Sequence, residues 1–196
     1  MGIYKGDFAR GQGLIEIMPC SSRPPARTLL LNRINGLREH IIDTRDSVKR
    51  VVTTVFLQEQ QAVDSVLAEA IAQGQCACWI RNTVKDAVET YQRLTQWYPE
   101  WQVDLFHARF ALHDRIEIEN RVVQRFSKNS GSTERRGQIL IATQVVEQSL
   151  DLDFDTLVSD LAPIDLLIQR AGRLRRHTRD AEGNRIVQAD HRGPVR

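Results

Sequence analysis

From about residue 50 onward, short apolar runs alternate with longer segments in which apolar residues recur every three to four positions. The short runs favour buried strands, and the longer period favours helices with one apolar face. The strands expected from this pattern are 51–57, 76–80, 103–106, 138–142 and 156–159. The expected helices are 63–71, 84–94, 112–127 and 164–173, with a polar loop at 127–137. This alternation predicts an α/β fold, in which a parallel sheet carries helices on both faces.

The first 45 residues show no sustained period, because glycine and proline interrupt them repeatedly. Two apolar stretches, 14–18 and 29–31, are the candidates for short elements in this region. We interpret residues 1–45 as an irregular connector or as the margin of a neighbouring domain.

Polar residues follow the predicted strands at 81–83, 107–109, 143–148 and 160–163. In parallel sheets, ligands bind beyond the carboxyl ends of the strands. Asn82 and Thr83 lie where a strand leads into a helix, and helix N-terminal amides favour a phosphate. The same two residues would also serve as an ordinary helix cap. Thr143, with its hydroxyl and amide, is a second candidate for holding a nucleic-acid phosphate.

A chain of 196 residues with 41% hydrophobic residues fits one compact domain with a modest extra segment. No apolar run approaches the roughly eighteen residues of a membrane span, and the first ten residues lack the apolar stretch of a secretory signal. We therefore expect a cytoplasmic protein without a membrane partner.

Metal-binding patterns are missing from the sequence. The three cysteines, Cys20, Cys76 and Cys78, form no C-x-x-C pair, so we expect buried thiols. The His113–Asp114 pair lacks the second histidine–aspartate set that a metal-dependent nuclease needs. No metal site is therefore expected in this chain.

The net charge is only +2, but the placement of the basic residues is informative. Arginine accounts for 23 of the 27 basic residues, and residues 170–196 hold eight arginines and no lysine. Guanidinium groups bind phosphate oxygens in pairs, as ammonium groups do not. Arg173 and Arg176 are three positions apart, which would place both on one face of the predicted helix. Glu147 and Asp153 are candidates for structural acids that pair with nearby arginines.

Two blocks of this sequence resemble motifs of superfamily 2 helicases. Motif VI, Q-R-x-G-R-x-x-R, is matched by Gln169, Arg170, Gly172, Arg173 and Arg176. Motif V is matched by Ala142, Thr143, Val145, Ser149 and Asp151. His107 and Arg115 also match the spacing that precedes motif V in this family. The resemblance covers about residues 50–180 and implies the second RecA-like domain of a helicase.

The resemblance also implies roles for individual residues. Arg173 and Arg176 would be catalytic arginine fingers that sense ATP, with Gln169 near the γ-phosphate. Asp151 would contact the ribose or couple the two helicase domains. The residues that would line a nucleic-acid single strand are Asn82, Thr83, Arg109 and Thr143. The cofactors would be ATP and Mg²⁺, shared with a first RecA-like domain.

The wording of motif V, from Thr143 to Asp151, is similar to that of the CRISPR-associated helicase-nuclease. That family implies an ATP-driven translocase on single-stranded DNA with an HD nuclease domain, recruited by an RNA-guided surveillance complex. Two alternatives stay open from the residues alone. One is another superfamily 2 helicase acting on RNA or duplex DNA, and the other is a non-catalytic nucleic-acid-binding remnant.

The phosphate-binding loop G-x-x-x-x-G-K-[ST] and the D-E-x-H motif do not occur in the sequence. Both belong to the first domain of such helicases, so we expect no ATP hydrolysis by this chain alone. The domains expected are a connector at 1–45, a RecA-like helicase C-terminal domain at 46–180, and a polar, arginine-containing tail at 181–196 that leads to a missing segment.

Overall fold

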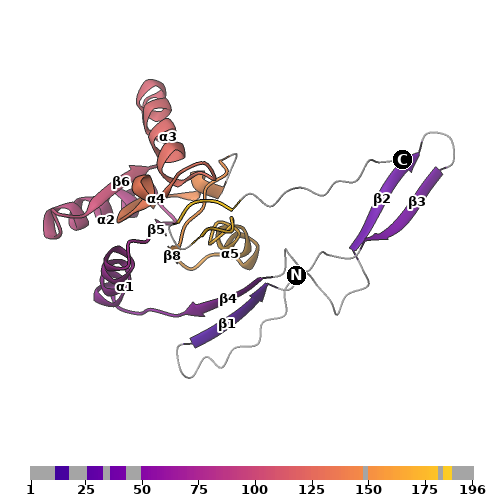
Figure 1. Cartoon of the computed structure of the whole chain (residues 1–196), viewed down its shortest axis with the longest axis horizontal. Coiled ribbons are helices and arrows are strands. Elements are labelled where there is room, and N and C mark those ends of the chain that lie inside the picture. The colour runs from indigo at the N-terminus through magenta and orange to yellow at the C-terminus, as the bar shows by residue number, and fades with distance from the viewer. Residues whose placement is uncertain are drawn as a thin grey trace. The chain divides into compact units, whose positions relative to one another are not determined.

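The computed structural model describes residues 12–17, 26–32, 36–42, 50–147, 150–180 and 183–186, with side chains from residue 52 onward. Cys20, Ser149 of motif V and most of the predicted tail at 181–196 lie outside these residues. The chain divides into two compact units, residues 1–58 and residues 59–196. Figure 1 shows the elements of both units.

The described residues of the first unit include two antiparallel strand pairs. Strand β1 (Gln12–Ile17) pairs with β4 (Arg50–Val55), and β2 (Ala26–Asn32) pairs with β3 (Gly36–Ile42). The candidate stretch at 14–18 falls on β1 up to Ile17, where the described residues stop, and the stretch at 29–31 falls on β2, whereas the pattern did not predict β3. The strand expected at 51–57 exists as β4, but its place in the parallel sheet was wrong, because it pairs with β1. The apolar pattern of a strand indicates which residues are extended, but it does not indicate which distant strand they pair with.

The second unit is built on a parallel sheet with the strand order β6-β7-β5-β8. Its strands are β5 (Ala77–Ile80), β6 (Gln102–Phe106), β7 (Gln138–Ala142) and β8 (Thr156–Ser159). Every residue of the two central strands, β5 and β7, is buried. Such continuous apolar strands are typical of parallel sheets covered on both faces.

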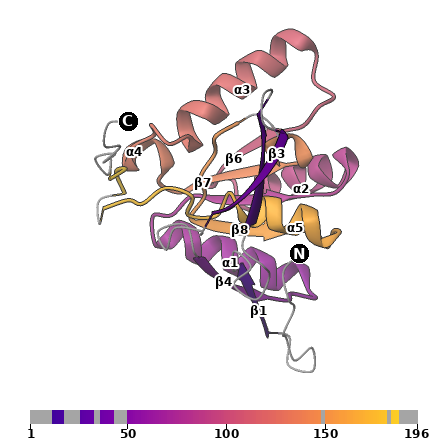
Figure 2. The same cartoon turned by 90° about the vertical axis from the view of Figure 1, so that its right-hand side faces the viewer.

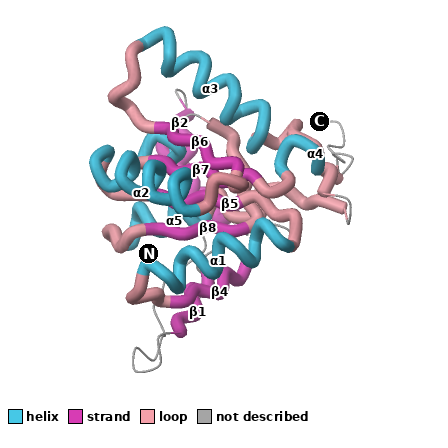
Figure 3. Tube along the Cα trace, turned by 90° about the vertical axis from the view of Figure 1, so that its left-hand side faces the viewer, coloured by secondary structure: helices cyan, strands magenta, loops and turns pink. Residues whose placement is uncertain are grey.

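Helices cover both faces of this sheet. The helical elements are α1 (Gln60–Ala72), α2 (Val84–Trp97), α3 (Leu112–Phe126), α4 (Ser132–Arg135), the 3₁₀ turn η3 (Gln144–Glu147) and α5 (Ile164–Ala171). Helices α1 and α2 lie on the face seen in Figure 3, and α5 lies on the opposite face seen in Figure 2. The predicted α/β class with a parallel sheet is therefore confirmed, and α4 lies within the expected polar loop at 127–137.

Local sequence explains where several of these helices begin and end. Thr83 caps α2, since its hydroxyl oxygen accepts a hydrogen bond from the amide of Asp86 at 3.1 Å. Helix α1 ends just before Gly74, whose backbone has a φ of +70°. Residues other than glycine rarely adopt that backbone conformation, so Gly74 allows the chain to turn sharply after the helix.

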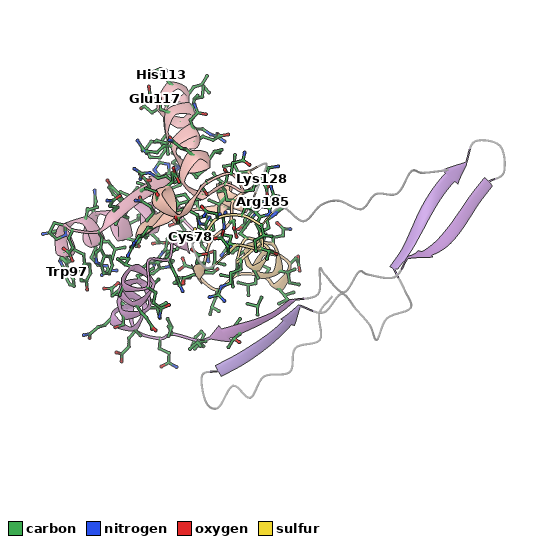
Figure 4. The ribbon with its side chains drawn as sticks, in the orientation of Figure 1. Cys78, Trp97, His113, Glu117, Lys128 and Arg185 are labelled. Carbon is green, nitrogen blue, oxygen red and sulfur yellow. The ribbon has the colours of Figure 1, made fainter. Side chains whose placement is uncertain are left out.

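The main core lies between the sheet and α3. Val122 and Phe126 of α3 are fully buried against alternate residues of the central strands, including Cys78 and Leu140. Phe154, which follows motif V, completes this core 5.2 Å from the ring of Phe126. Figure 4 shows Cys78 in the interior of the second unit.

Cys76 and Cys78 are buried, free thiols, as expected. Burial raises the pKa of both thiols well above the ordinary value, so neither is a reactive thiolate.

Ion pairs link the helices to their neighbours. Asp64 of α1 accepts two hydrogen bonds from Arg93 of α2, at 2.6 and 2.8 Å. Asp104 of β6 accepts from Arg125 of α3 at 2.5 Å and lies 3.2 Å from Arg121.

Within the residues that the structure describes, no helix is long and apolar enough to cross a membrane.

Candidate nucleotide and nucleic-acid interface

The strand register gathers the predicted site residues at one edge of the sheet. The four strands end at Phe106, Ala142, Ile80 and Ser159, which occupy matching positions across β6, β7, β5 and β8. The ladder continues by one residue, because the amides of Thr143, Arg81 and Asp160 donate to the ends of the neighbouring strands. The loops that carry His107, Thr143, Asn82 and Asp160 therefore emerge side by side.

Asn82 is exposed, and its side chain bridges two loops of this edge. Its Nδ2 donates to the carbonyl of Leu161 at 2.7 Å, and its Oδ1 accepts from Arg170 at 3.2 Å. Its backbone amide donates to Asp160 Oδ2 at 3.0 Å. The second hydrogen of Nδ2 has no acceptor among the described residues, so it remains available to a ligand.

Thr83 acts as the helix cap that the sequence allowed as an alternative. Its hydroxyl donates to Asp86 Oδ2 at 2.6 Å in addition to accepting from the Asp86 amide. The carboxylate of Asp86 thus lies in the first turn of α2, where it complements the positive end of the helix dipole.

Arg109 is exposed in the loop that follows β6, and no hydrogen bond or ion pair of its guanidinium group occurs among the described residues. Its amide donates to His107 Nδ1 at 3.2 Å, and the ring of His107 stacks on Phe110 at 4.0 Å. Burial, assisted by the charge of Arg109, lowers the pKa of His107. The imidazole is therefore held neutral, as its role as a hydrogen-bond acceptor requires.

Thr143 is buried, with only 2% of its surface exposed. Its amide already donates to the carbonyl of Phe106 at 3.2 Å, and its own carbonyl accepts from Val146 of η3 at 3.4 Å. The amide of Thr143 therefore has a partner within the sheet, because the ladder extends one residue past β7, and the contact of Thr143 with a phosphate stays a prediction.

Helix α5 ends earlier than its sequence pattern predicts. It stops at Ala171, so the prediction that Arg173 and Arg176 share a helical face was wrong. The backbone of Phe154 pairs with this segment instead, donating to the carbonyl of Arg173 at 2.9 Å and accepting from the amide of Arg175 at 2.7 Å. Arg175 adopts a φ of +44°, which turns the chain away from the helix axis.

The two predicted finger arginines have different environments. Arg173 donates to the backbone carbonyls of Glu147, at 2.8 Å, and of Leu150. Burial, and then repulsion by Arg176, lower the pKa of Arg173. Arg176 is more exposed, at 41% of its side chain, and its Nε lies 2.9 Å from Asp151 Oδ1. Gln169 is exposed on α5.

Three basic residues lie near Asp151. Besides Arg176, its carboxylate lies 3.4 Å from His177 Nε2 and 3.8 Å from Lys128 Nζ. Oδ1 is buried yet makes no hydrogen bond of good geometry with the described residues. Asp151 therefore pairs with Arg176, and its contact with a ribose stays a prediction.

Arg170 is the central residue that the sequence-based assignment of roles did not include. Its guanidinium group is buried and donates to Glu147 at 2.7 Å, to Ser159 at 2.9 Å, and to Asn82 and the carbonyl of Asp160 at 3.2 Å. Its match to motif VI, beside Gln169, was the available signal in the sequence. The prediction that Glu147 is a structural acid is confirmed by this ion pair.

Asp153 is confirmed as a structural acid as well. Its carboxylate accepts from Arg179 Nε at 2.9 Å and from the amide of Arg176 at 2.7 Å. Arg179 also donates to the carbonyls of Ser130 and Ser127. We call Asp153 with Arg179 the Asp153 clasp, because it ties the segment after α5 to the loop after α3.

His113, which the sequence paired with Asp114, lies on the outer end of α3, where Figure 4 labels it beside Glu117. Its Nε2 is 3.2 Å from Glu117, and both side chains are largely exposed. Among the described residues, no cluster of three or more histidine, cysteine or acidic side chains could hold a metal ion.

Comparison with known proteins connects this geometry to a family. Residues 73–179 match the family described as "CRISPR-associated nuclease/helicase Cas3, C-terminal". The CRISPR-associated endonuclease/helicase Cas3 of Escherichia coli K12 is 49% identical over 125 residues, which cover 63% of this chain and 14% of that protein. The chain thus spans a small part of the length of this relative.

Solved structures agree with the sequence comparison. The crystal structure of T. fusca Cas3-ADP matches with a TM-score of 0.57 and 44% identity, covering 62% of this chain and 14% of that one. A CRISPR RNA-guided surveillance complex in a pre-nicking state matches with a TM-score of 0.53 and 36% identity, covering 71% of this chain and 18% of that one. The family match includes the sheet edge and the arginines after α5, and the chain belongs to the C-terminal domain family of the CRISPR-associated nuclease/helicase Cas3.

Proposed function

We propose that this chain contributes the second RecA-like domain of an ATP-driven translocase on single-stranded DNA, acting in CRISPR antiviral defence. The observation that carries the proposal is the convergence of motif V and motif VI at one sheet edge. The carbonyls of η3 and its following loop hold Arg173, while Asp151 of the same loop holds Arg176. Both arginines therefore depend on the strand-end loop beside which a nucleotide would lie.

On the nucleotide side, Arg176 is the better candidate for direct contact with the γ-phosphate. It is the more exposed of the two arginines, and its partner Asp151 is half-exposed and shared with His177. A phosphate could replace this carboxylate as the partner of the guanidinium group without leaving a buried charge unpaired. Arg173 and Gln169 would support the same phosphate, and Asp151 would then accept a hydrogen bond from the ribose. Mg²⁺ would be held by the first RecA-like domain and by the phosphates themselves.

On the nucleic-acid side, Asn82, Thr83 and Arg109 are proposed to meet the backbone of a single strand, with Thr143 beneath them. The exposed guanidinium group of Arg109 and the free Nδ2 hydrogen of Asn82 support this assignment. Asn82 follows β5 and Arg109 follows β6, the two strands that flank β7, so their positions suit a ligand that runs along the sheet edge. The proposed protein partners are a first RecA-like domain, an HD nuclease domain and an RNA-guided surveillance complex.

The decisive experiment measures ATP turnover by this chain alone and after addition of a separately produced first helicase domain, each with and without single-stranded DNA. We expect turnover only in the mixture, and a loss of about 10³-fold in Arg176→Ala, because an arginine finger neutralises transition-state charge. Robust turnover by the pure chain would contradict the assignment of a half-site. If the mixture shows no ATP turnover while the chain still binds DNA, the result would favour a non-catalytic nucleic-acid-binding module.

A further inference from the structure

We propose that Arg170 is a positioning residue that couples the DNA-facing end of β5 to the nucleotide-facing Arg173, through Asn82 on one side and Glu147 on the other. The inference rests on the proposed function, because it takes Asn82 to meet DNA and Arg173 to meet the nucleotide. Its new content is the connection between these two sites within one domain.

The contacts on the DNA side are made by the outer nitrogens of the guanidinium group. Both Nη1 and Nη2 of Arg170 lie 3.2 Å from Asn82 Oδ1. Asn82 is exposed, whereas Arg170 is buried with only 2% of its surface accessible. A ligand that moves the Asn82 side chain therefore changes the hydrogen bonds of the buried Arg170 guanidinium group.

The contacts on the nucleotide side begin at the inner nitrogen of the same guanidinium group. Nε of Arg170 donates to Glu147 Oε1 at 2.7 Å, and both side chains are buried. The backbone carbonyl of Glu147 in turn accepts from Arg173 Nη2 at 2.8 Å. A shift of the Glu147 side chain would therefore move the carbonyl that orients Arg173.

Burial makes this path sensitive to either end. A charged pair removed from water is stabilised only while its hydrogen bonds are complete, and its interactions are poorly screened. Ser159 and the carbonyl of Asp160 also accept from Nη1 of Arg170, so displacement of Asn82 disturbs a nitrogen that is shared with two further partners. The coupling expected from such a network is about 5- to 150-fold in affinity.

A purely structural role of Arg170 would stabilise the fold without transmitting a signal, so stability measurements alone do not separate the two roles. The readout that does is the NMR signal of the Arg173 Nε–H group in the isotopically labelled full chain, assigned by its loss in Arg173→Lys. The titrant is a short oligothymidine single strand, and the Asn82 side-chain amide reports binding at the DNA edge.

In the wild-type chain, we expect the Asn82 and Arg173 signals to shift with the same midpoint of DNA concentration. In Arg170→Lys, the Asn82 signals should still shift and the Arg173 shift should be lost, because lysine offers one nitrogen in place of the separate nitrogens that contact Glu147 and Asn82. Glu147→Gln keeps the size of the side chain and removes its charge, so it provides a second test if the lysine variant folds poorly.

Arg93→Lys is the matched control, since Arg93 makes an equally close paired contact with Asp64 between α1 and α2. The Arg173 shift should persist in this variant. Two outcomes would overturn the coupling but not the proposed DNA edge. One is an Arg173 shift that persists in Arg170→Lys, and the other is a wild-type Arg173 signal that does not change with DNA while the Asn82 signal does. A wild-type chain in which neither signal responds would overturn the proposed DNA edge, and the coupling with it.

Discussion

At the residue scale, His107 illustrates how burial at the sheet edge changes the pKa of a side chain. Its pKa is lowered by burial, and its Nδ1 accepts a hydrogen bond from the amide of Arg109. The pKa of His177 is also lowered, again chiefly by burial. Each imidazole is therefore more easily protonated in the unfolded chain than in the folded one.

This difference predicts how stability depends on pH. As the pH falls below about 6.5, the unfolded chain binds the proton first, so the free energy of unfolding decreases until the folded-state pKa is reached. Above that range both states are neutral and these groups contribute no slope. Urea unfolding of wild type, His107→Asn and His177→Asn between neutral and mildly acidic pH checks this. Each substitution should flatten the curve, and a slope unchanged from wild type in both variants would contradict the assignment.

The sequence predicted some single residues better than others. The pairing of Glu147 and Asp153 with arginines was predicted, whereas the ion pair between Asp151 and Arg176 was not. Arg170 belonged to the same matched motif, yet its role escaped prediction, because its partners come from three loops that are distant in sequence. Burial of a charged side chain is a property of the assembled fold and not of local spacing.

At the element scale, α3 and β7 provide a matched test of burial. Leu140 of β7 is fully buried in the main core, whereas Leu112 at the start of α3 is 77% exposed. Leu140→Ala should lower the free energy of unfolding by about 2 to 5 kcal/mol, because it removes apolar contacts and leaves a cavity. Leu112→Ala should change it by less than about 0.5 kcal/mol. Chemical unfolding of both variants checks the pair, and similar losses in both would show that Leu112 packs against something.

The hydrophobic period predicted which segments are helices and which are strands, but it did not predict the end of α5 or the sheet to which β4 belongs. The strand 156–159 and the helix starting at residue 164 agree with the expected positions. The end of α5 was misplaced, because pairing of its continuation with Phe154 overrides helical propensity. Strand β4 was assigned to the wrong sheet for a similar reason, since its antiparallel partner β1 lies more than thirty residues earlier. Long-range pairing decided both cases.

At the scale of the whole molecule, a net charge of +2 implies that nucleic-acid binding depends on local groups rather than on overall attraction. If two phosphates are contacted, affinity for oligothymidine should fall about sevenfold between roughly 50 and 200 mM salt. Arg109→Ala should reduce the logarithmic salt slope by about 0.7, the loss of one phosphate contact.

The control for this titration is Arg136→Ala. Arg136 is exposed just before β7, at the amino ends of the strands and thus at the opposite edge of the sheet. Fluorescence anisotropy across a salt series gives the slope for each variant. An affinity that does not respond to salt, or an equal effect of both substitutions, would contradict the proposed edge.

Family and fold were predictable from the sequence because motif V and motif VI are short, local and located on predicted elements. The domain boundaries at 45 and 180 remain predictions, as do the roles of the site residues. What the sequence did not indicate was how firmly the segment after α5 is bound to the rest of the second unit.

The Asp153 clasp has a practical consequence for dissecting this protein. The carboxylate of Asp153 is 1% exposed and depends on Arg179 for one of its closest partners. A chain cut between motif VI and Arg179 would retain every matched motif and still lose that partner, together with the bonds from Arg179 to Ser127 and Ser130. A trimmed version of this unit that keeps the Asp153 clasp therefore has to include residue 179, which lies beyond the last matched motif.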